Sequence, residues 1–362
     1  GWNFNGGVSW KFYDDGEFPH MSRLKCLFGS ETVVPDTDYS GSGTSESPYL
    51  IDSVEKLAGI SLNLTAHYKL TSDIDNSNRC IRWSGLGSES SPFSGTFDGG
   101  DFEISSLLLD EKGSDLGFFK VVHSATIKNL KLKNFIEQQH SGYYYVGSLA
   151  GRIYNTDVSN VHNSGPVSSK SSYTGGLVGR VLDYSEISNS SSNSDVSISS
   201  WGSQIAGLIG RLEYSEINDS YSAGTLTAKG SLAGGLVGFT VDAEIHNSYS
   251  TMDIDHNNDQ RGYIGGLVGA IYHGTEVSNS YATGLVETNG SSSVGGLIGN
   301  HGYRNTARDS EINNCYATGS VNGSTNVGGL VGLIVSADDE INNSYSTGIV
   351  SGNPESNVGG LV

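Results

Sequence analysis

The sequence has few of the residues that stabilise small disulfide-rich or proline-rich proteins. Its 362 residues include three cysteines and six prolines. Six prolines beside 50 glycines exclude a collagen-like chain and a Pro/Gly-rich disordered tract. An odd and low cysteine count excludes a disulfide framework, although one bridge between Cys26 and Cys80 stays open.

Positive charge and long apolar runs are also scarce. Lys and Arg number 20 against 39 Asp and Glu, which gives a net charge of −19, and neither Lys nor Arg occurs after Arg308. Such a chain is repelled by phosphate backbones and anionic lipid, so no nucleic-acid partner is expected. No apolar run approaches 18 residues, so no membrane insertion is expected in this segment. The acidity fits either a soluble surface or weak Ca²⁺ sites outside cells, and both readings stay open.

What the chain does contain is a glycine-rich repeat. A Gly-Gly-Leu-Val-Gly block recurs at spacings of 28, 31, 28, 31, 30, 33 and 31 residues. The central leucines are Leu149, Leu177, Leu208, Leu236, Leu267, Leu297, Leu330 and Leu361. Self-similarity at a fixed period near 30 residues is typical of solenoid proteins.

A second block follows each first block by roughly ten residues. It reads Ile-Asn-Asn-Ser-Tyr or a close variant, and Cys315 occupies the position where other copies have Ser. We therefore expect Cys315 to be a small packed residue. The tyrosines of this block are Tyr221, Tyr249, Tyr281, Tyr316 and Tyr345.

The two blocks predict short strands that stack between repeats. Each block is too short and too rich in Gly for a helix, and turn residues bound each β-branched run. One repeat cannot bury its apolar face alone, whereas stacked copies pair in parallel about 4.8 Å apart. The sequence therefore predicts an all-β protein, a right-handed parallel β-helix whose hand follows the usual crossover rule.

The amino-terminal part departs from the repeat. Residues 1–35 are expected to be closing strands of a preceding unit or an N-terminal docking segment, and residues 36–48 a linker. Residues 49–116 are expected to form a cap and first strands, and residues 117–362 the β-helix repeats. Within the cap, Asp52 is the expected N-cap of a short helix that covers the open end of the core.

The repeated blocks resemble the GLUG-motif repeats. The lead-in at Tyr49-Leu50-Ile51 and the turn Phe93-Ser94-Gly95-Thr96-Phe97-Asp98-Gly99 resemble what precedes such repeats. The resemblance implies β-helical regions of large secreted or surface prokaryotic proteins. These include adhesin-like proteins and non-catalytic parts of IgA-specific metalloendopeptidases. It implies no catalytic residue, because the motif is architectural.

A search for chemistry yields few candidates. The sequence has no His-Glu-x-x-His, which argues against a zincin metal site, and no Gly-x-Ser-x-Gly, which argues against the nucleophile elbow of an α/β-hydrolase. It has no Gly-Lys dipeptide, which argues against a P-loop. No catalytic or cofactor-binding residue is therefore predicted. Oxygen ligands for Ca²⁺ are weakly indicated at Asp73 and Asp75 and at Asp253 and Asp255.

The tyrosine column is the main surface candidate. Aromatic side chains can bind sugars, so Tyr221, Tyr249, Tyr281, Tyr316 and Tyr345 are candidates for glycan binding. The alternative is that the rings stack on one another and shield the edge of the coil.

The expected function is structural and non-enzymatic. We expect an extracellular or cell-surface stalk or filament segment of an adhesin-like protein, cut from a longer polypeptide. Head-to-tail self-association is expected if exposed strand edges at the solenoid ends meet. The alternatives are a glycan or host-surface binding module, and an accessory region of a secreted protease or polysaccharide-active enzyme.

Overall fold

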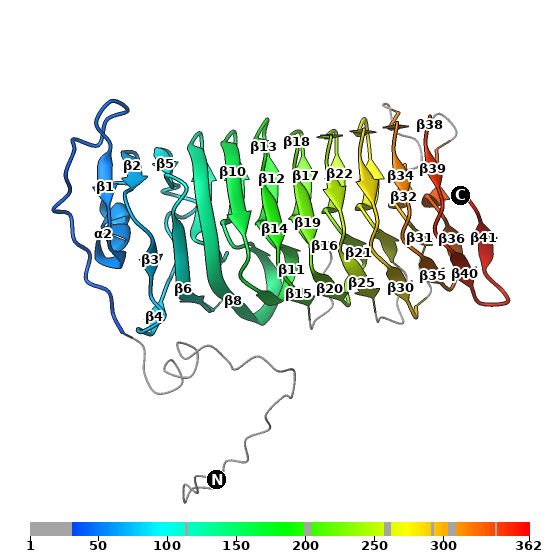
Figure 1. Ribbon diagram of the computed structural model, residues 1–362, viewed down its shortest axis with the longest axis horizontal. Coiled ribbons are helices and arrows are strands. Elements are labelled where there is room, and N and C mark those ends of the chain that lie inside the picture. The colour runs from blue at the N-terminus through cyan, green and yellow to red at the C-terminus, as the bar shows by residue number, and fades with distance from the viewer. Residues whose placement is uncertain are drawn as a thin grey trace, which may run out of the picture.

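The computed structural model is an elongated parallel β-solenoid of about nine turns (Figure 1). The prediction of an all-β stacked-repeat fold with a period near 30 residues is confirmed. The structure describes residues 31–112, 115–198, 204–256, 262–290, 293–302, 309–336 and 339–362.

Each complete coil contributes strands to five stacks, and every strand pairs in parallel with its equivalents in the neighbouring coils. The first stack is β1 (Tyr49–Ile51), β2 (His67–Leu70), β5 (Thr96–Asp98), β8 (Thr126–Val146), β10 (Asp157–Asn163), β13 (Glu186–Ser188), β18 (Glu216–Asn218), β23 (Glu244–His246), β28 (Glu276–Ser278), β33 (Glu311–Asn313) and β38 (Glu340–Asn342). The second, joined through β8 and β10, is β3 (Ile74–Asp75), β6 (Glu103–Leu109), β14 (Ser191–Asn193), β19 (Tyr221–Ala223), β24 (Tyr249–Ser250), β29 (Tyr281–Ala282), β34 (Tyr316–Ala317) and β39 (Tyr345–Ser346).

The remaining stacks complete the coil. The third, joined through β6 and β8, is β4 (Ile81–Arg82), β11 (Val167–Gly175), β15 (Val196–Ile198), β20 (Thr225–Ala228), β25 (Asp253–His256), β30 (Val286–Thr288), β35 (Val321–Gly323) and β40 (Val350–Gly352). The fourth, joined through β8 and β11, is β16 (Gln204–Ala206), β21 (Leu232–Gly234), β26 (Tyr263–Gly265), β31 (Ser293–Gly295), β36 (Asn326–Gly328) and β41 (Asn357–Gly359). The fifth is a separate sheet of β7 (Phe119–His123), β9 (Ala150–Tyr154), β12 (Val178–Leu182), β17 (Ile209–Glu213), β22 (Val237–Val241), β27 (Val268–Tyr272), β32 (Ile298–His301) and β37 (Val331–Ile334).

The solenoid begins earlier in the chain than the repeat pattern indicates. Tyr49 pairs with Tyr68, Tyr68 with Phe97, and Phe97 with Ile127, in the same column that later holds the repeat isoleucines. Residues 49–116 are therefore stacked coils in their own right. Their core is more aromatic than that of the later repeats, which is why the motif is hard to see there.

Each Ile-Asn-Asn-Ser-Tyr block makes a sharp bend between the first and second stacks. Its third residue takes a positive φ between 46° and 54° at Asn189, Asp219, Asn247, Asn279, Asn314 and Asn343. Asn and Asp tolerate this left-handed conformation better than other side chains that carry a Cβ atom. The bend explains why an amide or a carboxylate recurs at this position.

The serine after the bend links one coil to the next. The Ser220 hydroxyl donates to the carbonyl of Asn218 at 2.8 Å and accepts from the backbone N–H of Ser190 at 3.1 Å. Cys315 fills the same position as a buried free thiol, and its Sγ donates to the Asn313 carbonyl at 3.2 Å. Burial raises the pKa of the Cys315 thiol to about 11, so it packs as a small neutral group, as predicted.

The Gly-Gly-Leu-Val-Gly block makes the corner between the fourth and fifth stacks. The leucine points into the core, and Leu236, Leu267 and Leu297 are fully buried. The second glycine lies against the next coil, and a Cβ atom on Gly266 would lie 2.1 Å from the carbonyl oxygen of Gly296. Glycine is required at this position because the backbones of successive coils touch.

A short helix covers the amino-terminal end of the core, but its cap differs from the prediction. Helix α2 (Val54–Gly59), followed by the 3-10 turn Ile60–Leu62, has Ser53 as its N-cap. The Ser53 side chain accepts a hydrogen bond from the Lys56 N–H, while Asp52 forms an ion pair with the Lys56 ammonium at 3.1 Å. The prediction of Asp52 as N-cap is therefore wrong by one residue.

The segment 36–48, expected to be a linker, is packed against this helix. The Tyr39 hydroxyl donates to the Lys56 carbonyl at 2.9 Å, and the Tyr39 ring stacks on Tyr49 at 4.7 Å. The aromatic contact, invisible in a Ser- and Gly-rich composition, holds this segment on the cap. Residues 1–30 lie outside the described residues, and with them most of the segment 1–35 that was expected to hold closing strands or a docking segment. At the end of that segment, Glu31 forms a parallel bridge with Ile81.

Cys80 is disulfide-bonded, in agreement with the bridge left open by the sequence. The other cysteine of that expectation, Cys26, lies outside the described residues. The Cys80 bond belongs to the first coils of the solenoid, since Cys80 directly precedes β4.

The corner geometry predicts the effect of adding a methyl group at the second glycine. Gly266→Ala should lower the free energy of unfolding by about 1–3 kcal/mol, because the backbone of the next coil cannot move away from the added methyl group. Gly360 has the same motif position in the last coil, where a Cβ atom would meet nothing within 4 Å, so Gly360→Ala is the matched control. Chemical denaturation of both variants measures the difference, and equal stabilities would contradict the corner argument.

Candidate functional site

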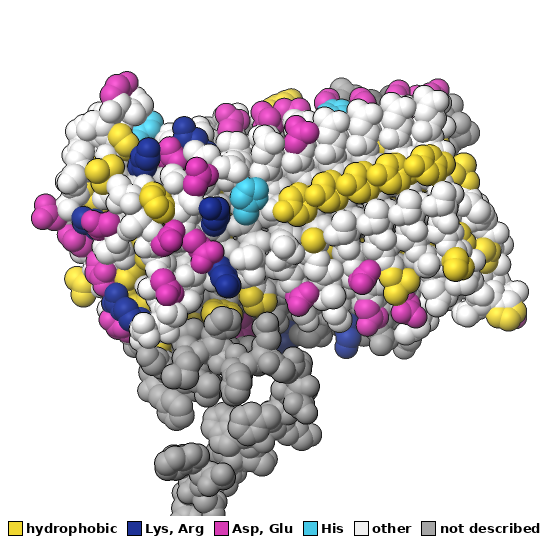
Figure 2. All heavy atoms as spheres, in the orientation of Figure 1, with side chains coloured by type: hydrophobic (Ala, Val, Ile, Leu, Met, Phe, Trp, Pro, Cys, Tyr) yellow, Lys and Arg dark blue, Asp and Glu magenta, His cyan; other side chains and the backbone are white. Residues whose placement is uncertain are grey.

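The exposed face formed by the first two stacks carries two straight columns of like side chains. The tyrosine ladder consists of Tyr221, Tyr249, Tyr281, Tyr316 and Tyr345. The carboxylate ladder consists of Asp157, Glu186, Glu216, Glu244, Glu276, Glu311 and Glu340. Figure 2 shows the tyrosine ladder as a continuous ridge along the later coils, with acidic side chains above it.

The five tyrosines form an unbroken stack of nearly parallel rings. Successive ring centroids lie 5.0, 4.8, 4.8 and 5.3 Å apart, and the rings are tilted by 4°, 2°, 4° and 9°. Burial, and after it the neighbouring phenols, raises the pKa of Tyr249 and of Tyr281. These two phenols are therefore neutral at ordinary pH, and aromatic contact along the ladder stabilises adjacent coils.

The stacking decides which part of each ring can meet a ligand. Both faces of Tyr249, Tyr281 and Tyr316 are covered by neighbouring rings, so sugars cannot stack on them. The hydroxyl-bearing edges are left at the surface. Glycan binding at these five residues stays a prediction, and it would have to use these edges.

The carboxylate ladder places like charges directly above one another. Its seven residues are half-buried or exposed, and parallel strands hold them about 4.8 Å apart. Within the described ranges no lysine or arginine pairs with them, and His246 lies 3.1 Å from Glu244. The amides of Asn313 and Asn342 donate to Glu311 and Glu340. Like charges opposite one another on neighbouring strands are destabilising.

Sequence reasoning missed this ladder. The signal is present, because an acidic residue directly precedes the apolar residue of the second block in Glu216-Ile217, Glu244-Ile245 and later copies. Only the pairing register shows that these acids share one column.

The acidic residues predicted as Ca²⁺ ligands accept hydrogen bonds from the protein. Asp73 accepts from the Glu103 N–H at 2.8 Å, and Asp253 from the Leu285 N–H at 2.8 Å. Asp255 lies beside Glu287 of the next coil, in the pairing of β25 with β30.

Asp75 is held in the same way, by hydroxyl and backbone donors. Burial acts to raise the pKa of Asp75, but hydrogen bonds from Ser77, Ser105 and Ser106 outweigh it and lower the pKa. In the part of the chain that the structure describes, no three His, Cys, Asp or Glu side chains form a group able to hold a metal ion. Calcium binding stays a prediction.

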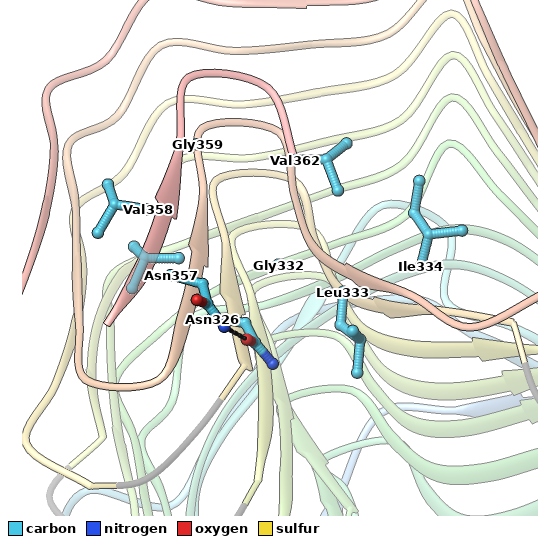
Figure 3. A pocket seen from close by; sticks show the side chains of 9 residues that line it. Asn326, Gly332, Leu333, Ile334, Asn357, Val358, Gly359 and Val362 are labelled. Carbon is cyan, nitrogen blue, oxygen red and sulfur yellow. Dashed lines mark hydrogen bonds between the residues drawn. The ribbon is translucent and has the colours of Figure 1, made fainter. Parts of the chain in front are cut away.

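An open hollow of about 280 Å³ lies near the carboxyl-terminal end, between β36, β37 and β41 (Figure 3). It is lined by Asn326, Val327, Gly332, Leu333, Ile334, Asn357, Val358, Gly359 and Val362. Asn357 donates to Asn326 at 3.0 Å across one wall. None of the lining side chains is ionisable, so the hollow supplies no general acid, base or nucleophile.

Arginines gather on the outer face of the fifth stack, where acids neutralise them. Arg152 pairs with Asp115 at 2.6 Å, and Arg180 pairs with Glu213 at 2.8 Å. The Arg152 guanidinium also lies 5.0 Å from the centre of the Tyr145 ring. These ion pairs join neighbouring coils, and the acids neutralise the charge of both arginines.

Two buried histidines lie in the solenoid wall. His256 donates through Nε2 to the Gly230 carbonyl at 2.6 Å, and its Nδ1 lies 3.2 Å from the Thr288 hydroxyl. His301 lies 3.2 Å from the Ser310 carbonyl through Nε2. Burial lowers the pKa of both imidazoles, so both are neutral in the folded protein.

Comparison with known proteins shows that the chain carries repeats of the GLUG motif. The motif is matched at residues 170–197, 229–255, 260–287 and 290–322, in agreement with the resemblance stated from the sequence. Halomucin of Haloquadratum walsbyi is 35% identical over 142 residues. The match covers 36% of this chain and 2% of halomucin, so the chain spans a very small part of that relative.

A solved structure from Bacteroides ovatus, described as a candidate immunoglobulin A1 protease, has a similar fold. It is 20% identical, with a TM-score of 0.50, and the match covers 89% of this chain and 86% of that one. At this identity the likeness concerns the fold alone. These findings are consistent with an extracellular repeat protein. Across the described residues, no helix combines the length and apolarity needed to span a bilayer.

The carboxylate ladder predicts a stability that rises with salt. Screening should weaken repulsion worth about 0.2–1 kcal/mol for each pair of rungs. Glu216→Gln with Glu276→Gln, which flank Glu244, should raise the melting temperature at low salt and reduce its salt dependence. Glu46→Gln with Glu355→Gln makes the same charge change at exposed residues outside the ladder. Equal effects of the two double variants would show that net charge, not register, is responsible.

The buried histidines predict a loss of stability on mild acidification. Because their folded-state pKa is lowered, their contribution is fully present above the unfolded pKa of about 6.5 and declines as the pH falls below it. Each histidine can contribute up to about 1.4 kcal/mol per pH unit in that range. His256→Gln should reduce the fall in melting temperature between about pH 7.5 and 5.5. An unchanged slope in the variant would contradict this assignment.

Proposed function

We propose that this chain, whose coils carry the GLUG motif, is a rigid structural segment of an extracellular repeat protein. It acts as a stalk that holds other parts of a longer polypeptide apart. Uniform register carries the proposal, since the column of Tyr49, Phe97, Ile217 and Ile341 is continued from the first described coil to the last.

Uniform register supports stiffness in a direct way. Each coil is joined to the next by parallel backbone hydrogen bonds in five stacks and by buried side chains, so bending breaks many contacts at once. A globular binding domain has no need of such repetition. A spacer does, because its length grows by about 4.8 Å with each added coil.

The extracellular location is supported by the chemistry of the chain. The disulfide at Cys80 is of a kind that persists in oxidising compartments and is rare in the cytosol. A surface poor in cations and rich in Ser, Asn and Asp suits an exposed stalk. The similarity to halomucin points in the same direction.

The proposal is non-enzymatic. The hollow at the carboxyl-terminal end has no ionisable wall, Arg152 and Arg180 on the fifth stack are paired with acids, and the two buried histidines face backbone carbonyls and a hydroxyl. An accessory role beside a catalytic domain stays compatible with a stalk, and sequencing the flanking gene would reveal such a domain.

Self-association and partners are part of the same proposal. A solenoid end presents strand edges that can pair with another copy, head to tail, and build a filament. A glycan or cell-surface partner on the tyrosine edges is the alternative. It would be lost in Tyr249→Ala with Tyr281→Ala while the fold is kept.

Electron microscopy of the purified protein tests the proposal. The nine turns should appear as straight rods about 40–50 Å long, or as fibres of uniform width if copies join end to end. Grids prepared with calcium and with chelator show whether assembly depends on the acidic residues. Flexible strings or compact spheres would contradict a rigid spacer.

A further inference from the structure

The tyrosine ladder stacks phenol rings directly on one another at the protein surface. The rings of Tyr249 and Tyr281 are 4.8 Å apart and 2° from parallel, and those of Tyr281 and Tyr316 are 4.8 Å and 4°. Backbone hydrogen bonds fix this spacing, since the Tyr249 N–H donates to Ser220 at 3.0 Å and the Tyr281 N–H to Ser248 at 3.2 Å.

We propose that the tyrosine ladder is a site of oxidative cross-linking, in which neighbouring rungs join as dityrosine and lock successive coils covalently. The reaction needs a one-electron oxidant, such as the ferryl haem of a peroxide-driven enzyme or a photo-oxidised metal complex. The inference goes beyond the stalk function and does not depend on it.

The chemistry balances as follows. The oxidant removes one electron from each of two neighbouring phenols, and each hydroxyl proton passes to water. The resulting phenoxyl radicals carry spin on the carbons ortho to oxygen, and the para carbon is blocked by its bond to Cβ. One ortho carbon of each ring joins to form a carbon–carbon bond, and the hydrogens on these carbons shift to the oxygens as aromaticity returns. The net change is loss of two electrons to the oxidant and of two protons to water.

The arrangement favours coupling within one molecule. A radical on any rung has another phenol against its face, so a second oxidation nearby yields a partner without diffusion. The ladder is also accessible, since its rings are half-buried and Tyr345 is 52% exposed. A cross-link would join strands that are adjacent in space but about 30 residues apart in sequence, which is the separation of coils.

Exposed tyrosines outside the ladder provide the contrast. Tyr143 and Tyr184 are 80% and 84% exposed, and Tyr214 is 44% exposed. If oxidation followed exposure alone, these residues would react first, and the cross-links would map to them. Coupling of Tyr184 with Tyr214 would also stay within one chain, since the Tyr184 N–H donates to the Tyr214 carbonyl of the neighbouring coil at 2.7 Å.

The experiment compares two double variants that remove the same number of phenols. Tyr249→Phe with Tyr316→Phe keeps five stacked rings but leaves no two phenols adjacent. Tyr184→Phe with Tyr214→Phe leaves the ladder intact. Each dilute protein is illuminated with tris(bipyridine)ruthenium and persulfate, and dityrosine is measured by fluorescence and located by mass spectrometry of cross-linked peptides.

The expected result is cross-linking within single chains, mapped to neighbouring rungs such as Tyr249 and Tyr281. The yield should fall at least several-fold in the alternate-rung variant and stay unchanged in the control variant. Cross-links that map to Tyr143 or Tyr184, or a yield that the alternate-rung variant leaves unchanged, would overturn the proposal. Because phenylalanine can stack as tyrosine does, circular dichroism of both variants should match the parent.

Discussion

Parallel pairing at a register of one coil is the constraint on which the rest of the structure depends. Every residue lies directly above its equivalent in the previous coil, so each position must tolerate contact with a copy of itself. Isoleucine on isoleucine fills the core, serine on serine links the turns, and glycine on glycine lets the backbones touch at the corner. A small gain or loss of free energy at one such contact is therefore repeated in every coil.

The same constraint produces the two ladders with opposite energetic signs. Tyrosine on tyrosine is favourable, because the rings stack over the whole column from Tyr221 to Tyr345. Glutamate on glutamate is unfavourable, and no cation pairs with Glu216, Glu276 or Glu311 in the described structure. The solenoid tolerates this repulsion because hydrogen bonds and core packing in five stacks outweigh it, and because the carboxylates reach solvent.

The sequence was most informative where one residue type repeats. The leucines of the first block and the tyrosines of the second predicted the columns and the stacked architecture, because periodicity reports contacts between copies. It was least informative in the first coils, whose sequences differ from the repeat. The aromatic column of Tyr68 and Phe97 carries no motif, Tyr39 holds a segment whose composition resembles a linker, and Ser53 rather than Asp52 caps the helix. The carboxylate ladder could not be predicted, because only the pairing register of the strands shows that these separate acids lie in one column.

Pulling a single molecule from both ends tests the central claim that the chain is a rigid stack of separately bonded coils. The account predicts discrete release steps, each lengthening the chain by about 100 Å or a whole multiple of it, as one coil of about 30 residues becomes extended. Smooth extension without steps would contradict it, since a chain that yields in that way cannot serve as a stiff spacer.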